Sequence, residues 1–480
     1  MNIRVVLNFV GRVLIFIGIF MILPVLVSLY YKEDDLSAFL IGVLACTASG
    51  IVLVFLFYGA KGDFRHREGF LFVTLSWVAA GFMGAIPFKV SGYFTTYMDA
   101  LFETISGFTT TGASILIDIE MLPHGLLLWR SLIQWLGGMG IIVLSVAILP
   151  FLGVGGMQIF NAEAPGPTVD KLAPRMSATA KLLWGTYFGI TMVEIVLLWA
   201  GSMDLFDATC HAFTTMATGG FSPRNTSIGS YNSVYVDTVI TIFMLIAGAS
   251  FSLHYAALKG DIKRYIKNTE FRWYISIFII GCVIVMWSTR GVFSSMGESV
   301  RYVTFQVASI FTTTGFATYD YVKWPATPQI ILLLLMIVGG CAGSTGGGLK
   351  VMRLVLLIKY AYREILRLVH PNAVVTIKLG RNPVSADILR AVIGFSIFYI
   401  LIFVLASVAM SLLGLDFETS LSSVIACMSN IGPGLAHVGP MANYAQIPYV
   451  GKLVLTFCML VGRLEIYTVL VVLSPAFWRA

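Results

Sequence analysis

The sequence Thr109-Thr110-Thr111-Gly112-Ala113-Ser114 recurs in altered form three more times, roughly a hundred residues apart. The other copies are Ala217-Thr218-Gly219-Gly220-Phe221-Ser222, Thr312-Thr313-Thr314-Gly315-Phe316 and Ser429-Asn430-Ile431-Gly432-Pro433-Gly434. We call Thr110–Gly112, Thr218–Gly220, Thr313–Gly315 and Asn430–Gly432 the first to fourth glycine turns. Repetition at this interval indicates a duplicated unit, so the sequence predicts four copies of one hairpin around a shared centre.

The composition is typical of a protein embedded in a membrane. Of the 480 residues, 58% are hydrophobic and 11% are charged, and the mean hydropathy is +0.88. Soluble domains carry about 25% charged residues, and about 20 apolar residues suffice for a helix to cross the hydrocarbon core. We therefore expect an integral membrane protein with ten spans, centred near residues 17, 47, 80, 138, 191, 245, 282, 342, 400 and 460.

Basic residues follow alternate spans. They gather in four connections: Lys61, Arg65 and Arg67; Lys171 and Arg175; Lys259, Lys263, Arg264, Lys267 and Arg272; Lys350, Arg353, Lys359, Arg363, Arg367, Lys378 and Arg381. By the positive-inside rule these connections and both termini are expected in the cytoplasm, which an even number of spans allows. The net charge of +7 therefore indicates orientation in a membrane rather than nucleic-acid binding. The six cysteines are scattered in apolar segments and predict neither a disulfide framework nor a metal site.

Each glycine turn follows a short segment with helical spacing. These segments, near residues 98–109, 206–217, 301–312 and 418–429, are too short to cross a bilayer and are expected to be re-entrant. Non-helical backbone survives at membrane depth only when it is buried in protein or lines water, so an aqueous lumen is implied. The chain then divides into an N-terminal helix pair, 1–60, and four repeats, 61–165, 166–265, 266–368 and 369–480. The predicted fold is all-α, with four span–short helix–span repeats around a pseudo-fourfold pore.

The glycine turns carry the chemistry expected of a cation filter. Main-chain carbonyls can replace the hydration shell of a cation, and glycine permits the φ values that point them inward without blocking the lumen. We expect three levels of oxygen ligands: Gly112, Gly220, Gly315 and Gly432; Thr111, Gly219, Thr314 and Ile431; and Thr110, Thr218, Thr313 and Asn430.

A run of small residues interrupts the second span of the third repeat: Gly339-Gly340-Cys341-Ala342-Gly343-Ser344-Thr345-Gly346-Gly347-Gly348. Glycine costs about 1 kcal/mol inside a helix, so the run is expected to unwind at membrane depth. Residues 343–348 then predict a flexible gate below the filter. The alternative is a site of tight helix packing.

Arg463 lies at the matching depth of the fourth repeat. A cation at the centre of a membrane helix costs roughly 2.5–3.5 kcal/mol, so this side chain should face water or a partner. We expect it to donate to carbonyls of the glycine-rich run, which would pin the gate and repel cations. The alternative is a structural ion pair with Glu465. Arg130, near the outer end of its span, is expected to snorkel toward water.

The four motifs, the glycine-rich run and Arg463 together resemble the TrkH/TrkG branch of the Trk/Ktr/HKT family of K⁺ transporters, over essentially the whole chain. The resemblance implies K⁺ uptake across the bacterial cytoplasmic (inner) membrane by a homodimer with one pore per protomer. It implies K⁺ as substrate, no other bound cofactor, and a cytosolic TrkA-like ring that binds nucleotide and controls opening. Sodium-selective plant relatives carry serine at the first filter glycine, so Gly112 favours K⁺.

Two other functions fit parts of the sequence. A symporter coupled to H⁺ or Na⁺, with the same filter, would also use broken helices. It would be favoured by paired inverted repeats and intramembrane carboxylates, and neither is evident. An intramembrane enzyme would need a nucleophile and a base at depth, and Ser344 has no histidine or second catalytic group in its segment. We therefore expect a transporter rather than an enzyme.

Overall fold

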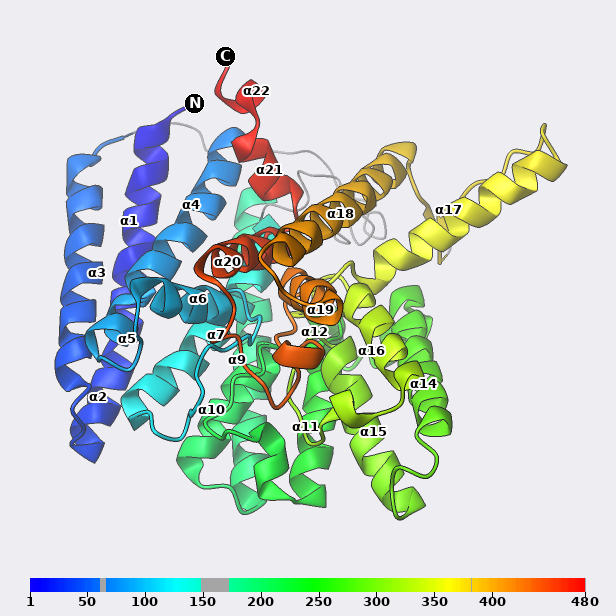
Figure 1. The fold of residues 1–480 in the computed structure, drawn as a ribbon. Helices are drawn as coiled ribbons and strands as arrows, with labels where there is room; N and C mark the ends of the chain where they lie inside the picture. The colour runs from blue at the N-terminus through cyan, green and yellow to red at the C-terminus, as the bar shows by residue number, and fades with distance from the viewer. Residues whose placement is uncertain (61–65, 148–171, 381, 480) are drawn as a thin grey trace.

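The computed structural model describes residues 1–60, 66–147, 172–380 and 382–479, which are mostly helical (Figure 1). The N-terminal pair consists of α1 (Ile3–Phe20), continued by α2 (Ile22–Tyr31), and α3 (Leu36–Leu56). A Cβ built on Gly11 would lie 2.8 Å from the carbonyl oxygen of Gly50, and one built on Gly50 would lie 2.6 Å from that of Gly11. This reciprocal contact shows that small residues let α1 and α3 touch backbone to backbone.

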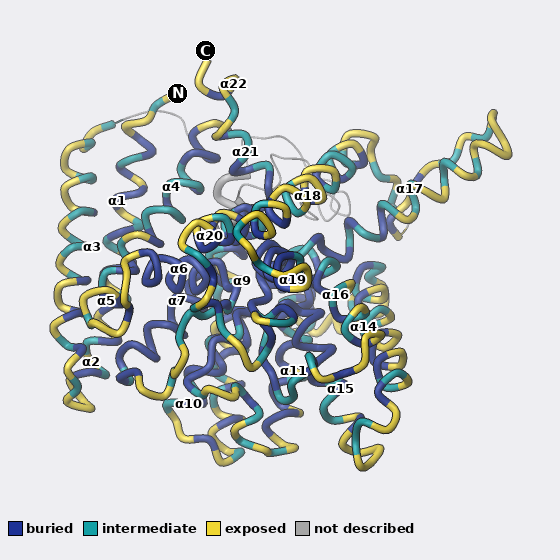
Figure 2. The backbone as a smooth tube through the Cα atoms, in the orientation of Figure 1, coloured by how far each residue is buried: buried dark blue, intermediate teal, exposed yellow. Residues whose placement is uncertain are grey.

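Short helices precede the four glycine turns: α6 (Tyr97–Phe108), α10 (Leu205–Met216), α15 (Met296–Phe311) and α19 (Phe417–Met428). Figure 2 shows α6 and α19 largely buried in the middle of the bundle. Each begins after a side chain that accepts a hydrogen bond from the backbone N–H three residues on: Thr96, Asp204, Ser295 and Asp416. Three helices begin within one residue of the prediction, whereas α15 begins earlier because Ser295 caps it.

Within the described residues, seven helical stretches are long and apolar enough to span a membrane: 3–31, 36–56, 67–90, 124–142, 179–200, 269–288 and 386–412. Beyond α1–α3 they belong to α4 (His66–Gly84) with α5 (Ile86–Val90), α7 (His124–Ala147), α9 (Leu172–Ala200), α14 (Thr269–Ser288) and α18 (Ala386–Leu412). Two further candidates are bent pairs: α11 (Val234–Ala247) with α12 (Phe251–Leu258) at 102°, and α20 (Tyr449–Arg463) with α21 (Tyr467–Leu473) at 117°. These stretches contain nine of the ten predicted span centres.

The tenth predicted span, near residue 342, is not one helix. α16 (Ala326–Val338) ends at Gly339, residues 339–350 are non-helical, and α17 (Val351–Val369) follows. Gly339, Gly343 and Gly348 have φ values of 72°, 76° and 72°, which a continuous helix excludes. The prediction that the glycine-rich run breaks this span and unwinds is therefore confirmed.

Beyond the run, α17 projects away from the bundle (Figure 1). It leads to a hairpin of β1 (Lys378–Leu379) and β2 (Asn382–Pro383), antiparallel with Lys378 opposite Pro383. The remaining short elements are α13 (Lys263–Lys267), α22 (Pro475–Trp478) and the 3₁₀ turns Ser227–Tyr231, Tyr321–Lys323 and Ala436–Val438.

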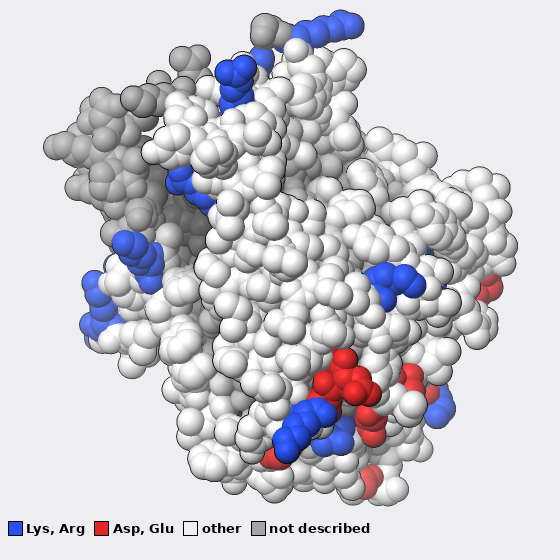
Figure 3. All heavy atoms as spheres, turned by 90° about the vertical axis from the view of Figure 1, so that its left-hand side faces the viewer, with Lys and Arg blue, Asp and Glu red and all other residues white. Residues whose placement is uncertain are grey.

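The surface is that of an integral membrane protein. Figure 3 shows a broad uncharged expanse on the face beside the N-terminal helices, with acidic residues gathered toward its lower end. Both chain ends lie at the same end of the molecule (Figure 1). The predicted repeat boundary at 165–166 falls outside the described residues, as do Lys61, Arg65, Lys171 and Arg381 of the basic connections. The division into four repeats stays a prediction.

Candidate functional site

The four glycine turns share one unusual backbone conformation. Their first residues have φ values of 52° at Thr110, 53° at Thr218, 62° at Thr313 and 56° at Asn430. Their glycines have φ values of 80° at Gly112, 74° at Gly220, 85° at Gly315 and 96° at Gly432. A β-branched residue with positive φ is a strained outlier that costs on the order of 1–3 kcal/mol. Three threonines at the same turn position therefore mark a conformation imposed by the surrounding structure.

The turns also meet in cyclic order. Each glycine faces a carbonyl oxygen of the next turn along the chain, and the fourth glycine faces the first turn. A Cβ built on the glycine would lie very close to that oxygen: 2.1 Å from Gly112 to the Gly219 oxygen, 2.1 Å from Gly220 to the Thr314 oxygen, 1.9 Å from Gly315 to the Ile431 oxygen, and 2.7 Å from Gly432 to the Thr111 oxygen. A real Cβ would not fit at any of these contacts, so glycine is required at all four positions. All four glycines also line one cavity of about 110 Å³.

The polar side-chain oxygens of the turns divide into two sets. Thr111 Oγ1 pairs with Thr109 Oγ1 at 2.7 Å, and Thr314 Oγ1 with Thr312 Oγ1 at 2.8 Å. At the first turn position, Thr218 donates to the Ala217 carbonyl and Thr313 accepts from the Gly347 N–H. Thr110 Oγ1 and Asn430 Oδ1, by contrast, are buried without a hydrogen-bond partner among the described residues. Two side-chain oxygens are thus unused at the third predicted level of oxygen ligands.

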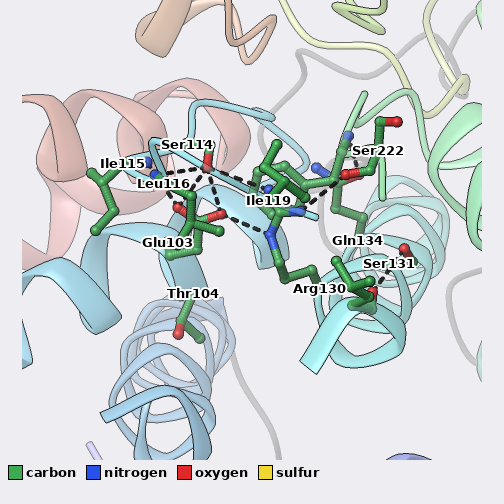
Figure 4. A network of polar contacts seen from close by, with 12 residues as sticks. Glu103, Thr104, Ser114, Ile115, Leu116, Ile119, Arg130, Ser131, Gln134 and Ser222 are labelled. Carbon is green, nitrogen blue, oxygen red and sulfur yellow. Dashed lines mark hydrogen bonds and ion pairs between the residues drawn. The ribbon is translucent and has the colours of Figure 1, made fainter. Parts of the chain in front are cut away.

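Behind the first two turns lies a buried polar network (Figure 4). Arg130 of α7 donates to Glu103 Oε1 at 2.9 Å and to the Ser222 carbonyl at 3.1 Å, and its guanidinium lies 4.2 Å from the centre of the Phe221 ring. Glu103 also accepts from Ser114 Oγ at 2.9 Å. Arg130 is 1% exposed, so the expectation that it snorkels is wrong. It instead ties together the segments that follow the first two glycine turns.

Removing Glu103 should destabilise this region strongly. Breaking a buried ion pair leaves an uncompensated charge, so Glu103→Ala is expected to lower the free energy of unfolding by about 3–5 kcal/mol. Thermal unfolding of the purified protein in detergent measures this change. Asp387→Ala is a matched control, because Asp387 pairs with Arg390 at a site where both side chains are at least 77% exposed. Such a pair should be worth less than about 1 kcal/mol. Equal losses in the two variants would contradict the role of the buried pair.

The glycine-rich run lies directly against the ends of three of the short helices. The Gly347 N–H donates to Thr313 Oγ1 at 2.7 Å, and Thr345 Oγ1 donates to the Met216 carbonyl at 2.9 Å. A Cβ built on Gly347 would lie 2.1 Å from the Ser429 carbonyl oxygen. The run therefore touches the residues that lead into the second, third and fourth glycine turns. Gly343, Ser344, Gly346 and Gly348 belong to the same non-helical segment.

Arg463 of α20 links the glycine-rich run to α7. Its Nη1 donates to the Thr345 carbonyl at 2.6 Å and its Nη2 to the Gly137 carbonyl of α7 at 3.3 Å. The predicted donation to the run is thus observed. The alternative pairing with Glu465 is not, since Glu465 accepts from Arg353. The side chain is 2% exposed and its Nε has no partner among the described residues, so the guanidinium is enclosed by protein.

Comparisons with known proteins found relatives that match the chain over nearly its whole length. The family model described as TrkH, a cation transport protein, matches residues 35–479. The Trk system potassium uptake protein TrkH of Escherichia coli (strain K12) is 44% identical over 485 residues and covers 100% of both chains. The TrkG protein of the same organism is 35% identical over 491 residues, which are 100% of this chain and 99% of its own. The crystal structure of the potassium transporter TrkH from Vibrio parahaemolyticus superposes with a TM-score of 0.93 at 37% identity, covering 100% of both chains.

The family model matches nearly the whole length of this chain, and more than a third of the aligned residues are identical in each of these relatives. Similarity of this extent and level shows the family as well as the fold. The chain therefore belongs to the TrkH family of cation transport proteins.

Proposed function

We propose that this chain takes up K⁺ through a central pore whose selectivity filter is the ring of four glycine turns. The observation that carries the proposal is the cyclic order in which each glycine faces a carbonyl of the next turn. Such a ring offers main-chain oxygens that replace the hydration shell of an ion without a fixed charge that would trap it. The short helices end at the turns, so the negative ends of their dipoles add to cation attraction. The names of the relatives, potassium uptake proteins, support K⁺ as the substrate.

The gate in this proposal is formed by residues 343–348 and Arg463. Support comes from the contacts of Gly347 and Thr345 with the residues leading into the glycine turns. Arg463 holds the same segment through the Thr345 carbonyl. In this proposal its positive charge stands next to the ion path. A cation leaving the filter would meet both an obstructing backbone and an unfavourable charge. Opening then requires the run to leave these contacts.

Uptake of ⁸⁶Rb⁺ into liposomes tests the function directly. Liposomes that contain the purified protein and are loaded with K⁺ should accumulate ⁸⁶Rb⁺ down the electrical gradient that the K⁺ gradient creates. External K⁺ should compete with this uptake, and the same concentration of Na⁺ should compete far less. Uptake no greater than in protein-free liposomes, with the protein folded, would refute the proposal.

A symporter coupled to H⁺ is the second candidate, and one residue favours it. Glu194 of α9 is fully buried, and among the described residues its carboxylate lies near the Thr215 hydroxyl without a well-formed hydrogen bond and has no ion-pair partner. A carboxyl group in such a place is far less costly to bury with a bound proton than without one. Intramembrane carboxylates of this kind serve proton relays in other transporters. An imposed inward proton gradient without a K⁺ gradient should then drive ⁸⁶Rb⁺ accumulation, and Glu194→Gln should abolish it. A channel shows no such accumulation.

We further propose a homodimer in the bacterial inner membrane, with cytoplasmic termini and a cytosolic TrkA-like nucleotide-binding ring on the inner face. Both chain ends lie at one end of the molecule (Figure 1), and Lys263, Lys267 and Arg367 are exposed basic residues of the predicted inner connections. Nucleotide is expected on the ring and not on this chain.

Docking of the ring should weaken at high salt. The Debye length falls from about 10 Å at 0.1 M salt to about 3 Å at 1 M, so attraction between exposed charges is largely lost. Co-purification of the ring with the transporter should therefore decrease across this range, and the double variant Lys263→Glu, Lys267→Glu should bind less at low salt. Binding that ignores ionic strength would argue against docking on the basic face.

A further inference from the structure

One buried side chain outside the glycine turns holds the second turn directly. Gln134 of α7 is fully buried, and its Nε2 donates to the Gly219 carbonyl at 2.7 Å. Its Oε1 accepts from the Phe221 N–H at 3.1 Å. Figure 4 shows Gln134 on the same helix as Arg130. Both ends of one amide thus bind the backbone on either side of Gly220.

The other turns are restrained differently. In the first and third turns, a threonine at the middle position pairs with a threonine two residues earlier, as Thr111 does with Thr109 and Thr314 with Thr312. The second turn has Gly219 and Ala217 at these positions and cannot form such a pair. The amide of Gln134 supplies in the second turn a restraint that the hydroxyl pair supplies in the first and third turns.

Gln134 also explains why residue 219 is glycine. Gly219 is not one of the glycines with positive φ, so its backbone conformation does not exclude a side chain. A Cβ built on Gly219 would instead lie 2.4 Å from both Cδ and Oε1 of Gln134. The side chain of Gln134 therefore occupies the space that a threonine would fill in the first or third turn.

The Gly219 carbonyl oxygen lies at the contact between the first and second glycine turns. The Gly219 carbonyl is the one that Gly112 of the first turn faces, at 2.1 Å from a Cβ built there. A shift of this oxygen would change the spacing between two neighbouring turns. The hydrogen bond from Gln134 also occupies one of the two lone pairs of the Gly219 carbonyl oxygen, so that only the other is free for a cation.

We propose that Gln134 is a positioning residue that sets the discrimination between K⁺ and Na⁺, acting through the Gly219 carbonyl. This inference rests on the proposed function of the glycine turns as a K⁺ filter. Without the amide, the carbonyl is free to move toward a smaller ion, and the spacing of the ring is no longer fixed for K⁺.

The test measures reversal potentials under bi-ionic K⁺ and Na⁺ conditions in reconstituted membranes. Gln134→Met keeps the size and removes both hydrogen bonds, and it is expected to lower the K⁺/Na⁺ permeability ratio about tenfold, the scale of one buried carbonyl left unpaired. Ser131→Ala is the matched control one turn earlier on α7, since the Ser131 hydroxyl donates within its own helix to Leu127. It should leave the ratio unchanged.

A second set of variants tests the exchange of restraints. Gly219→Thr alone should lose selectivity because the new side chain overlaps Gln134. Adding Gln134→Ala and Ala217→Thr makes room for it and rebuilds the threonine pair, so the ratio should recover toward the original value. A structural defect alone would not be reversed in this way. If Gln134→Met does not fold, recovery in the triple variant supports the inference and its failure contradicts it.

The filter itself is tested in parallel with Gly112→Ser. If Gly112→Ser changes the permeability ratio and Gln134→Met does not, the role of Gln134 is refuted and the filter stands. If neither variant changes the ratio, the proposed filter is refuted as well.

Discussion

Replacing Arg463 by alanine is expected to raise K⁺ flux in reconstituted vesicles by about tenfold or more. The variant removes the hydrogen bond from Nη1 to the Thr345 carbonyl and the positive charge beside the proposed ion path. A hydrogen bond from a charged donor is worth about 1.5–3 kcal/mol, and about 1.4 kcal/mol corresponds to tenfold in the opening equilibrium. Deletions within 343–348 should also raise K⁺ flux, because they shorten the segment proposed to obstruct the ion path.

Two variants separate charge from general disruption. Arg463→Lys keeps the charge but cannot bridge Thr345 and Gly137 with a planar fork, so its flux should fall between those of the original protein and Arg463→Ala. Arg290→Ala removes a guanidinium that lies over Trp287 on the exposed surface, and flux should not change. Flux that stays level or falls in folded Arg463→Ala would show that the gate is assigned to the wrong residues.

Gly112→Ser is expected to raise the permeability of Na⁺ relative to K⁺ by about tenfold or more. The serine Cβ would overlap the Gly219 carbonyl oxygen, 2.1 Å away, and the residue would have to hold a φ of 80°. Both effects displace carbonyls that are proposed to contact the ion, and a strained turn costs on the order of 1–3 kcal/mol. A ring with one displaced turn can no longer match the hydration shell of K⁺ on all sides.

Gly189→Ser provides the control for serine in a membrane helix. Gly189 lies in α9, and a Cβ built there meets no atom within 4 Å. Reversal potentials should therefore be unchanged in this variant and shifted toward that of Na⁺ in Gly112→Ser. Identical reversal potentials for Gly112→Ser and the original protein would remove the first glycine turn from the filter.

The local part of the fold was predictable from the sequence. Ser, Thr and Asp caps fix where the short helices begin, and a glycine turn follows each helix within a few residues. The unwound run follows from the low helix propensity of its glycines. These features depend on neighbouring residues alone, so reading along the chain suffices to find them.

Contacts between distant segments were not predictable in the same way. Arg130 lies 27 residues from Glu103 and 92 from Ser222, and its position near a span end is equally typical of a snorkelling arginine. Gln134 lies 85 residues from Gly219 and stands in an apolar helix with no other mark of a role. One signal was available for the first pair. A carboxylate in a short buried helix needs a cation, and Arg130 is the arginine of the following span.

The break near residue 342 shows what hydropathy alone leaves out. Hydropathy describes the run as apolar, although its backbone needs φ values that no helix provides. Composition within a window does not record this requirement.

Anomalous diffraction from crystals grown with Rb⁺ tests the central claim most directly. We predict a peak on the axis between the four glycine turns, within coordination distance of main-chain oxygens from all of them. Density bound elsewhere, or beside only one or two turns, would contradict the claim that four duplicated turns together replace the water around one potassium ion.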